Sequence, residues 1–198
     1  MKPPRVTLRP NPAYLKAFAE IMARIARALG PKPPGKPVTV CVAGGAAMHF
    51  YTGARYSNDI DATILARVML DPQDLQVAYR GEDGHARLLY FDTQYNDSFA
   101  LLHVDAYHDA LPIGVDGVDP RWLDVTLLTP LDLAVSKLSR YSAQDQEDIR
   151  GLARAGLIDA PGVQARAEAA LPDYVGNLDR IRNSIALAGH LIAANRPG

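Results

Sequence analysis

The chain has 198 residues, of which 48% are hydrophobic and 22% are charged, and its formal net charge is −1. This length and hydrophobic fraction suit one domain with a substantial core, or one domain with a helical extension. The near-neutral charge excludes a global basic field that would hold nucleic acid, although it leaves room for a local basic patch.

The cysteine content and the N-terminal sequence indicate the cellular compartment in which the protein is expected. The single cysteine, Cys41, lies in the apolar run 38–42, which predicts a buried structural thiol rather than a nucleophile. One cysteine leaves no disulfide framework within the chain, which fits a reducing compartment. The opening MKPPRVTLRPNP has prolines where a signal peptide needs an apolar core, and no apolar run approaches the ~20 residues of a membrane span. We therefore expect a cytoplasmic protein without a membrane partner.

The first third of the chain predicts a helix and then short alternating elements. Asn11 before Pro12 is typical of a helix start, and hydrophobic residues recur at helical spacing until Gly30 ends the helix. The elements predicted next are a buried strand over 38–42 and a turn at 44–45. A short helix over 46–51 and a second strand over 59–65 follow.

The middle of the chain is less regular. Asp71-Pro72 predicts the start of a short helix that runs to Tyr79. Residues 86–91 and 99–107 predict a pair of β-strands, and residues 123–128 predict one more strand.

From Thr129 onwards the pattern is helical. Thr129-Pro130-Leu131-Asp132 combines an N-cap, a proline at the first helical position and an acid in the first turn. The predicted helices cover 130–141, 143–155, 161–171 and 177–194. We expect an α+β fold in which residues 1–128 form a core with an N-terminal helix and a small mixed sheet flanked by helices. Residues 129–198 are expected to form a C-terminal helical array packed on that core.

The first chemical pattern is Asp59-Ile60-Asp61. Alternate residues of a strand share a face, so both carboxylates should point the same way while Ile60 points into the core. Two carboxylates on one face repel unless a cation lies between them, and such oxygen ligands suit Mg²⁺. Taken alone, however, an Asp-x-Asp is more often a pair of solvent-facing acids.

The second pattern is Gly44-Gly45, which follows a buried strand and precedes a short helix. This arrangement exposes backbone N–H groups near a helix N-terminus, where phosphate can bind, although a tight turn is the simpler interpretation. Arg55, four residues before Asp59, is either a phosphate contact or a surface arginine.

A third carboxylate would complete a two-metal site for phosphoryl transfer. Asp105 is the candidate, because an unpaired acid is costly on the apolar strand predicted for this segment. His103 would share its face, and we interpret it as a structural histidine.

The order of Gly-Gly, short helix, Arg, Asp-x-Asp and a later strand Asp resembles the nucleotidyltransferase superfold of DNA polymerase β type. More narrowly, VAGGAAMHFYTGARYSNDIDATI resembles the AbiEii-type nucleotidyltransferases, bacterial proteins of which several are toxins of toxin–antitoxin or phage-defence systems. Their pattern is Gly-Gly-x-Ala followed by Arg-x-(Ser/Thr)-x-Asp-(Ile/Leu)-Asp. Ser57 matches the Ser/Thr position of this pattern. Ala46 stands where many nucleotidyltransferases have serine, which removes one phosphate hydrogen bond.

A second segment, LTPLDLAVSKLSRYSAQDQEDIRGLARAGLI, resembles the later motifs of this family, a helical lysine followed by Asp-x-x-Asp. Lys137 matches the lysine, and Asp145 or Asp148 matches the acid. A helical hairpin would bring Lys137 to Asp145 and fold over the metal site. Without the resemblance, a weakly stabilising surface charge pair is the simpler interpretation.

The resemblance implies a Mg²⁺-dependent transfer of NMP from an NTP to an acceptor, which is an RNA 3′ end such as that of tRNA, a protein or a small molecule. A toxin would also have a cognate antitoxin as a partner. The residues implied as catalytic are Asp59, Asp61, Asp105, Lys137 and Asp145, with Asp59, Asp61 and Asp105 as metal ligands. Those implied in nucleotide binding are Gly44, Gly45, Arg55, Ser57, Lys137 and Asp148.

Two alternatives stay open. The first is a non-catalytic nucleotide-binding or partner-binding module, antitoxin-like, on the same fold. The second is a metal-dependent phosphohydrolase, which would need histidines clustered with the acids. The spacing of the histidines in this chain does not indicate such a cluster.

Overall fold

The structure is a computed structural model that describes residues 6–66 and 68–197. It divides into two compact units, which we call the sheet unit and the helical unit. The sheet unit comprises Arg9–Tyr95 and Ala110–Leu127, and the helical unit comprises the described parts of Met1–Leu8, Asn96–Asp109 and Leu128–Gly198.

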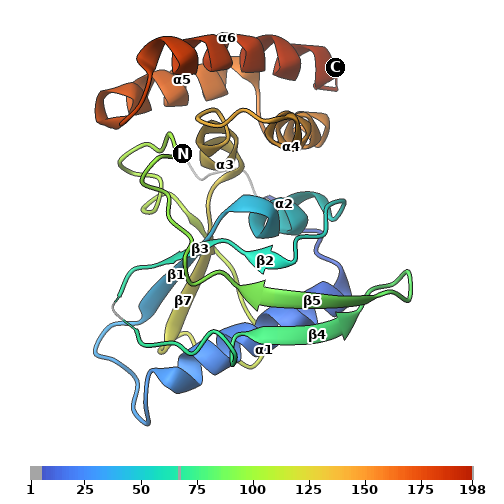
Figure 1. The fold of residues 1–198 in the computed structure, drawn as a ribbon, viewed down its shortest axis with the longest axis vertical. Helices are drawn as coiled ribbons and strands as arrows, with labels where there is room; N and C mark the ends of the chain where they lie inside the picture. The colour runs from blue at the N-terminus through green and yellow to red at the C-terminus, as the bar shows by residue number, and fades with distance from the viewer. Residues whose placement is uncertain (1–5, 67, 198) are drawn as a thin grey trace. The chain divides into compact units, whose positions relative to one another are not determined.

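The sheet unit contains two helices and two small sheets (Figure 1). Its elements are α1 (Pro12–Ala28), β1 (Val38–Val42), α2 (Gly44–Thr52), β2 (Asp59–Ile60), β3 (Ala62–Ile64), β4 (Gln76–Arg80), β5 (Ala86–Phe91), β6 (Leu111–Pro112) and β7 (Leu123–Leu127). One sheet is mixed and has the strand order β3-β1-β7-β6, with β1 parallel to β7 and antiparallel to β3. The other has the order β2-β5-β4, with β2 parallel and β4 antiparallel to β5.

Helix α1 begins where the sequence predicts. The Asn11 side chain accepts hydrogen bonds from the backbone N–H groups of Ala13 and Tyr14, and Pro12 occupies the first helical position. The apolar face of α1 packs against β4 and β5. Its fully buried side chains are Tyr14, Phe18, Ile21, Met22 and Ile25. The core of the sheet unit therefore lies between this helix and the β2-β5-β4 sheet, and it also includes the buried thiol of Cys41.

The helical unit contains α3 (Pro130–Ser136), α4 (Ala143–Arg154), α5 (Ala160–Ala170), the short 3₁₀ turn η1 (Leu171–Asp173) and α6 (Leu178–Asn195). The Thr129 side chain caps α3 as predicted, because it accepts a hydrogen bond from the Asp132 N–H group. Ser142 and Asp145 form a reciprocal capping box at the start of α4.

The described residues form six α-helices beside small mixed sheets, so the α+β fold class predicted from the sequence is confirmed. No helix in the described part of the chain combines the length and the apolarity that crossing a membrane requires.

Three of the predicted strands and helices are wrong. Residues 59–65 are not one strand, because the chain leaves the β2 pairing after Ile60 and joins the other sheet as β3. No helix follows Asp71-Pro72. Instead the Asp71 side chain accepts a hydrogen bond from the Gln73 N–H group, which forms a local turn, and the strand β4 begins at Gln76.

The predicted strand at 99–107 is also absent from the structure, and β5 pairs with β4 instead. Local bonds between side chains and backbone explain this difference. The Asn96 side chain accepts from the Ser98 N–H group, and the His103 ring accepts from the Asp105 N–H group. Such bonds hold the chain in turns and compete with strand pairing.

Candidate functional site

The two aspartates of the Asp-x-Asp pattern lie at the junction between the two sheets. Asp59 belongs to β2 and is paired in register with Tyr90 of β5, whereas Ala62 already belongs to β3. Asp61 lies between them, and its backbone carbonyl accepts a hydrogen bond of 2.8 Å from the Ala43 N–H group just before α2. Ile60 is fully buried while both aspartates are partly exposed, as the predicted alternation requires.

Gly44 and Gly45 bring the start of α2 against these carboxylates. Gly44 has φ +53°, and a Cβ added to it would lie 2.8 Å from the Cβ and 2.7 Å from the Cγ of Asp61, closer than real Cβ atoms approach. A Cβ on Gly45 would meet the side chain of Ser57 at a similarly short distance. Neither glycine can therefore take a side chain unless its neighbours move.

The first turn of α2 has no side-chain cap. Its N-cap residue, Ala43, has no side chain that could cap the helix. The predicted turn at Gly44-Gly45 is in fact the first turn of this helix. The backbone N–H groups of such a turn, together with the helix dipole, favour a bound phosphate.

Ser57 and Arg55 lie beside these glycines. The buried hydroxyl of Ser57 donates a hydrogen bond of 2.5 Å to Oδ1 of Asp59, which fixes the orientation of that carboxylate. The guanidinium carbon of Arg55 would lie 3.4 Å from a Cβ on Gly45, so this side chain reaches the start of α2. Four of the predicted nucleotide-binding residues are thus brought to one place with the Asp-x-Asp pair.

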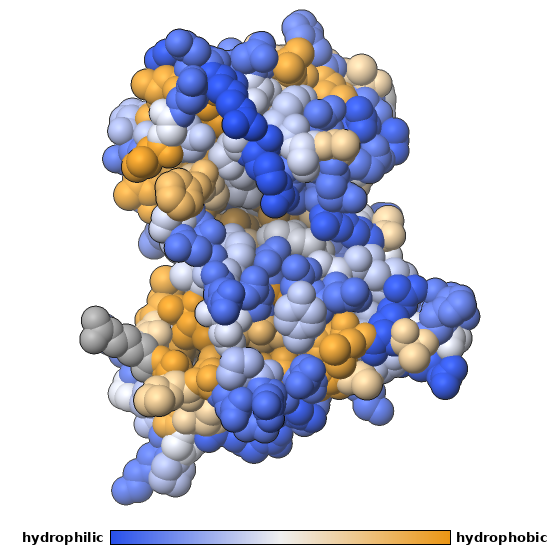
Figure 2. Space-filling view, viewed as in Figure 1, coloured by the Kyte–Doolittle hydropathy of each residue, from blue (hydrophilic) through white to orange (hydrophobic). Residues whose placement is uncertain are grey.

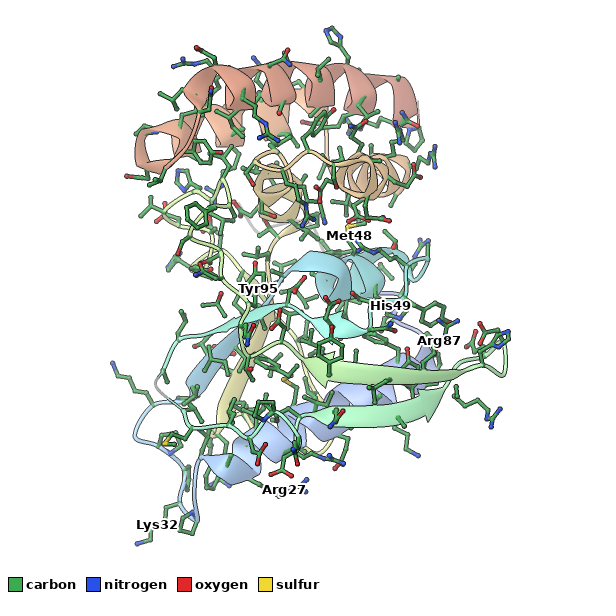
Figure 3. The ribbon with its side chains drawn as sticks, viewed as in Figure 1. Arg27, Lys32, Met48, His49, Arg87 and Tyr95 are labelled. Carbon is green, nitrogen blue, oxygen red and sulfur yellow. The ribbon has the colours of Figure 1, made fainter. Side chains whose placement is uncertain are left out.

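His49 of α2, labelled in Figure 3, holds the loop that carries Arg55. Its ring is fully buried, and Nε2 accepts a hydrogen bond of 3.0 Å from the Asn11 N–H group. Nδ1 therefore carries the proton and donates to the Arg55 carbonyl at 2.5 Å. Burial lowers the pKa of His49 and so favours this neutral form. The hydrogen bond to the Arg55 carbonyl has a smaller, opposite effect on the pKa.

A further acid near this segment, Asp92, was not singled out in the sequence. The parallel pairing of Ile60 with Phe91 brings Asp61 and Asp92 to the next position on neighbouring strands. The Asp92 N–H group donates to the Ile60 carbonyl at 3.1 Å. Its position directly after the apolar strand 86–91 is a signal that the sequence contains, but the parallel pairing of β2 with β5 is not visible there.

The acids also affect the hydroxyl of Tyr90. Burial, followed by the negative charges of Asp59, Asp92 and Asp61, raises the pKa of the Tyr90 hydroxyl. Across residues 6–66 and 68–197, however, no three acidic, imidazole or thiol side chains are close enough to form a metal-binding group by themselves. A site built on Asp59 and Asp61 therefore fits Mg²⁺ in the mode that takes two carboxylates and completes its shell with phosphate oxygens and water.

Asp105, the predicted third metal ligand, has a different setting from the one expected. It lies in a turn of the helical unit rather than on a strand, and its carboxylate is 60% exposed, at 3.7 Å from Nδ1 of His103. The physical argument for its importance, an acid on an apolar strand, is therefore lost. Its role as a metal ligand stays a prediction that rests on the resemblance.

Lys137, Asp145 and Asp148 form a second cluster, within the helical unit. Lys137 is the C-cap residue of α3, and its Nζ lies 2.6 Å from Oδ2 of Asp148 and 3.9 Å from Oδ1 of Asp145. All three side chains are buried. The predicted hairpin of α3 and α4 therefore brings the lysine to both candidate acids.

Arg140 and Ser142 complete this cluster. The guanidinium of Arg140 donates to both oxygens of Asp145, at 2.8 and 2.7 Å, and the hydroxyl of Ser142 donates to Oδ2 at 2.7 Å. Burial raises the pKa of Asp145, but the hydrogen bonds from Arg140 and Ser142 outweigh it and bring the value to about 2. The charges in the cluster are thus compensated within one hairpin.

An α+β fold with small mixed sheets flanked by helices is consistent with a nucleotidyltransferase fold. The chain belongs to the family described as nucleotidyltransferase of unknown function (DUF6036), which matches residues 16–185. This match confirms the predicted nucleotidyltransferase family but does not identify the AbiEii type. No curated protein and no solved structure matches the chain.

Proposed function

We propose that this protein is a Mg²⁺-dependent nucleotidyltransferase that transfers NMP from an NTP to an acceptor hydroxyl and releases pyrophosphate. One observation supports the proposal above all. The side chains of Asp61 and Ser57 occupy the space that a Cβ on Gly44 or Gly45 would fill. This contact places an Asp-x-Asp carboxylate directly beside a helix N-terminus that suits phosphate.

Asp59 and Asp61 would hold Mg²⁺, and phosphate oxygens and water would complete its shell. The bound ion would supply neutralisation of the negative charge that builds up on the phosphates during transfer. Asp105 keeps only the support of the resemblance for this role, because its predicted strand is absent.

The chain's own groups would position the triphosphate. The N–H groups at the start of α2 would bind the β- and γ-phosphates, and Arg55 reaches the same turn. Ser57 would keep the Asp59 carboxylate in one orientation, and His49 would keep the Arg55 backbone in place. Positioning and charge stabilisation of this kind supply most of the catalysis in phosphoryl transfer.

The cluster around Lys137 has a simpler role that its contacts support. The charges of Lys137, Asp145 and Asp148 are compensated together with that of Arg140, so we assign the first three residues the stabilisation of the α3–α4 hairpin. The nucleotide-binding and catalytic roles that the AbiEii resemblance implies for these three residues remain predictions. The same holds for a toxin activity, a cognate antitoxin and a tRNA acceptor.

Label transfer tests the proposal. The pure protein is incubated with each α-³²P-labelled NTP, Mg²⁺ and a bacterial extract of RNA and protein, and the products are resolved on a gel. Asp59→Asn and Asp61→Asn should abolish labelling, because each removes a charged oxygen from the Mg²⁺ site. The matched control is Asp179→Asn in α6, where the carboxylate is fully exposed, and it should label as the wild type does.

Full labelling by both site variants would refute the metal assignment. If the wild type transfers no label from any NTP, calorimetry with Mg²⁺ and each NTP decides for or against the alternative of a non-catalytic nucleotide-binding module. Binding that is lost in Asp61→Asn would support that alternative.

A further inference from the structure

One face of the β2-β5-β4 sheet is open to solvent next to the carboxylates. Alternate residues of β4 and β5 are less exposed and lie on the side of α1, which passes behind both strands in Figure 1. The opposite face carries Tyr90 and Leu88, which are 40% and 44% exposed. Figure 2 shows hydrophobic side chains among hydrophilic ones on the surface of the sheet unit.

Strand register places Tyr90 beside the Asp-x-Asp pair. Tyr90 is the direct partner of Asp59 on one side and of Gln76 on the other, so these three side chains form a row across the open face. Neighbouring strands lie about 4.8 Å apart, so the Tyr90 ring is the aromatic group next to the carboxylate.

In-line phosphoryl transfer assigns this face to the acceptor. The attacking and leaving oxygens lie on opposite sides of the phosphorus. Helix α2 contacts β2, and β5 lies on the other side of β2, so the elements follow the order α2, β2, β5, β4 (Figure 1). If the leaving pyrophosphate is held at the start of α2, the acceptor hydroxyl must approach over β5, where Tyr90 is exposed.

We propose that Tyr90 is a stacking platform for the acceptor, and that the acceptor carries a nucleobase next to its reactive hydroxyl. This inference rests on the proposed function. An exposed aromatic ring beside a phosphoryl-transfer site suits the flat face of a base, and Leu88 extends the apolar surface along β5. The amide of Gln76 follows in the same row and can hydrogen-bond to the edge of a base.

The far end of the same face can bind a phosphate of the acceptor. Arg80 is the register partner of Ala86, two positions beyond Leu88, and its side chain is exposed. Its Nη1 donates to the Gly84 carbonyl at 2.6 Å, which holds the guanidinium near this end of the sheet. A guanidinium there suits the backbone of a strand whose terminal base lies on Tyr90.

The inference is tested by separating the KM values of the two substrates. Transfer to a short single-stranded RNA and to a free mononucleotide is compared for the wild type, Tyr90→Ala and Tyr90→Phe. Tyr90→Ala should raise the KM for the acceptor by about 10-fold or more and leave the KM for the NTP unchanged, because base stacking on an aromatic side chain is lost. Tyr90→Phe keeps the ring and should restore the wild-type value.

The matched control is Leu187→Ala in α6, another partly exposed hydrophobic side chain, which should change neither KM. If Tyr90→Ala raises the KM for both RNA and mononucleotide, the terminal nucleoside is sufficient for recognition by Tyr90. If it raises the KM for RNA alone, the acceptor is an RNA end. The inference is overturned if Tyr90→Ala leaves the acceptor KM unchanged, raises the KM for the NTP instead, or if the labelled product is a protein.

A binding measurement keeps this inference separate from the proposed function. Tyr90→Trp in a Trp122→Phe background leaves one tryptophan, because the chain has only Trp122. Added RNA or mononucleotide should quench its fluorescence, even if no variant transfers label. Quenching without transfer would refute the proposed function and support the platform, and the absence of quenching by either compound would refute the platform.

Discussion

Gly44→Ala should inactivate the protein without unfolding it. Gly44 has φ +53°, a conformation that costs an alanine about 1–2 kcal/mol. The added methyl group would also lie 2.7 Å from Cγ and 2.8 Å from Cβ of Asp61. Rotation of the carboxylate alone does not relieve the contact with Cβ, so the backbone at Asp61 or at the start of α2 must shift.

Such a shift would move the carboxylate away from the turn that we propose binds phosphate. A misplacement of about 1 Å in a phosphoryl-transfer site can lower the rate by about 10²-fold, which corresponds to about 2.7 kcal/mol of transition-state stabilisation. We therefore expect Gly44→Ala to lower kcat/KM by about 10²-fold or more in the label-transfer assay. Its free energy of unfolding, measured in urea, should fall by at least the conformational cost of about 1–2 kcal/mol.

Gly117→Ala is the matched control. Gly117 has φ +73° in the same unit, and a Cβ there meets nothing within 4 Å. This variant should likewise lose about 1–2 kcal/mol of stability and should keep wild-type transfer. Equal activity of the two variants would refute the reasoning, because it would show that the contact between Gly44 and Asp61 does not position the site.

Three further predictions concern the polar contacts. Ser57→Ala removes the hydrogen bond that orients Asp59 and should raise the Mg²⁺ concentration for half-maximal transfer by about 10–100-fold, measured by Mg²⁺ titration; an unchanged titration would contradict the assigned role. Lys137→Met leaves the buried Asp148 without its lysine and should lower the free energy of unfolding by about 3–5 kcal/mol. A second change, Asp148→Leu, should recover part of this loss. Urea unfolding measures both variants. Asp145 has a pKa of about 2 in the folded protein against 3.8 as its ordinary value, so its contribution of about 2 kcal/mol is complete above pH 5 and should disappear as the pH falls from 4 to 2. Urea unfolding at a series of pH values should show this loss in the wild type and a smaller one in Asp145→Asn.

The elements with local signals were predictable from the sequence. Asn11 and Pro12 mark the start of α1, and Thr129 and Ser142 cap α3 and α4, because each cap is set by residues within one helical turn. The approach of Lys137 to the acids of α4 was also predictable, since a short connection between two helices fixes it.

The composition of the carboxylate site was less predictable, because it depends on pairing between distant strands. Asp92 lies beside the end of β2 only because β5 is parallel to β2, and no local pattern specifies that register. Asp105 was misplaced for the opposite reason. Its apolar surroundings suggested a strand, but local side-chain bonds such as the one from its own N–H group to His103 favour a turn.

The change of sheet after Ile60 has a consequence for ligand binding. Asp59 is hydrogen-bonded into one sheet, and Ala62, directly after Asp61, is hydrogen-bonded into the other. Any ligand that engages both carboxylates therefore cross-links the two sheets through a segment of only three residues. Binding at the site would therefore also hold the two sheets together. If the proposed nucleotide and Mg²⁺ bind there, they should raise the melting temperature further as their concentration increases above the Kd.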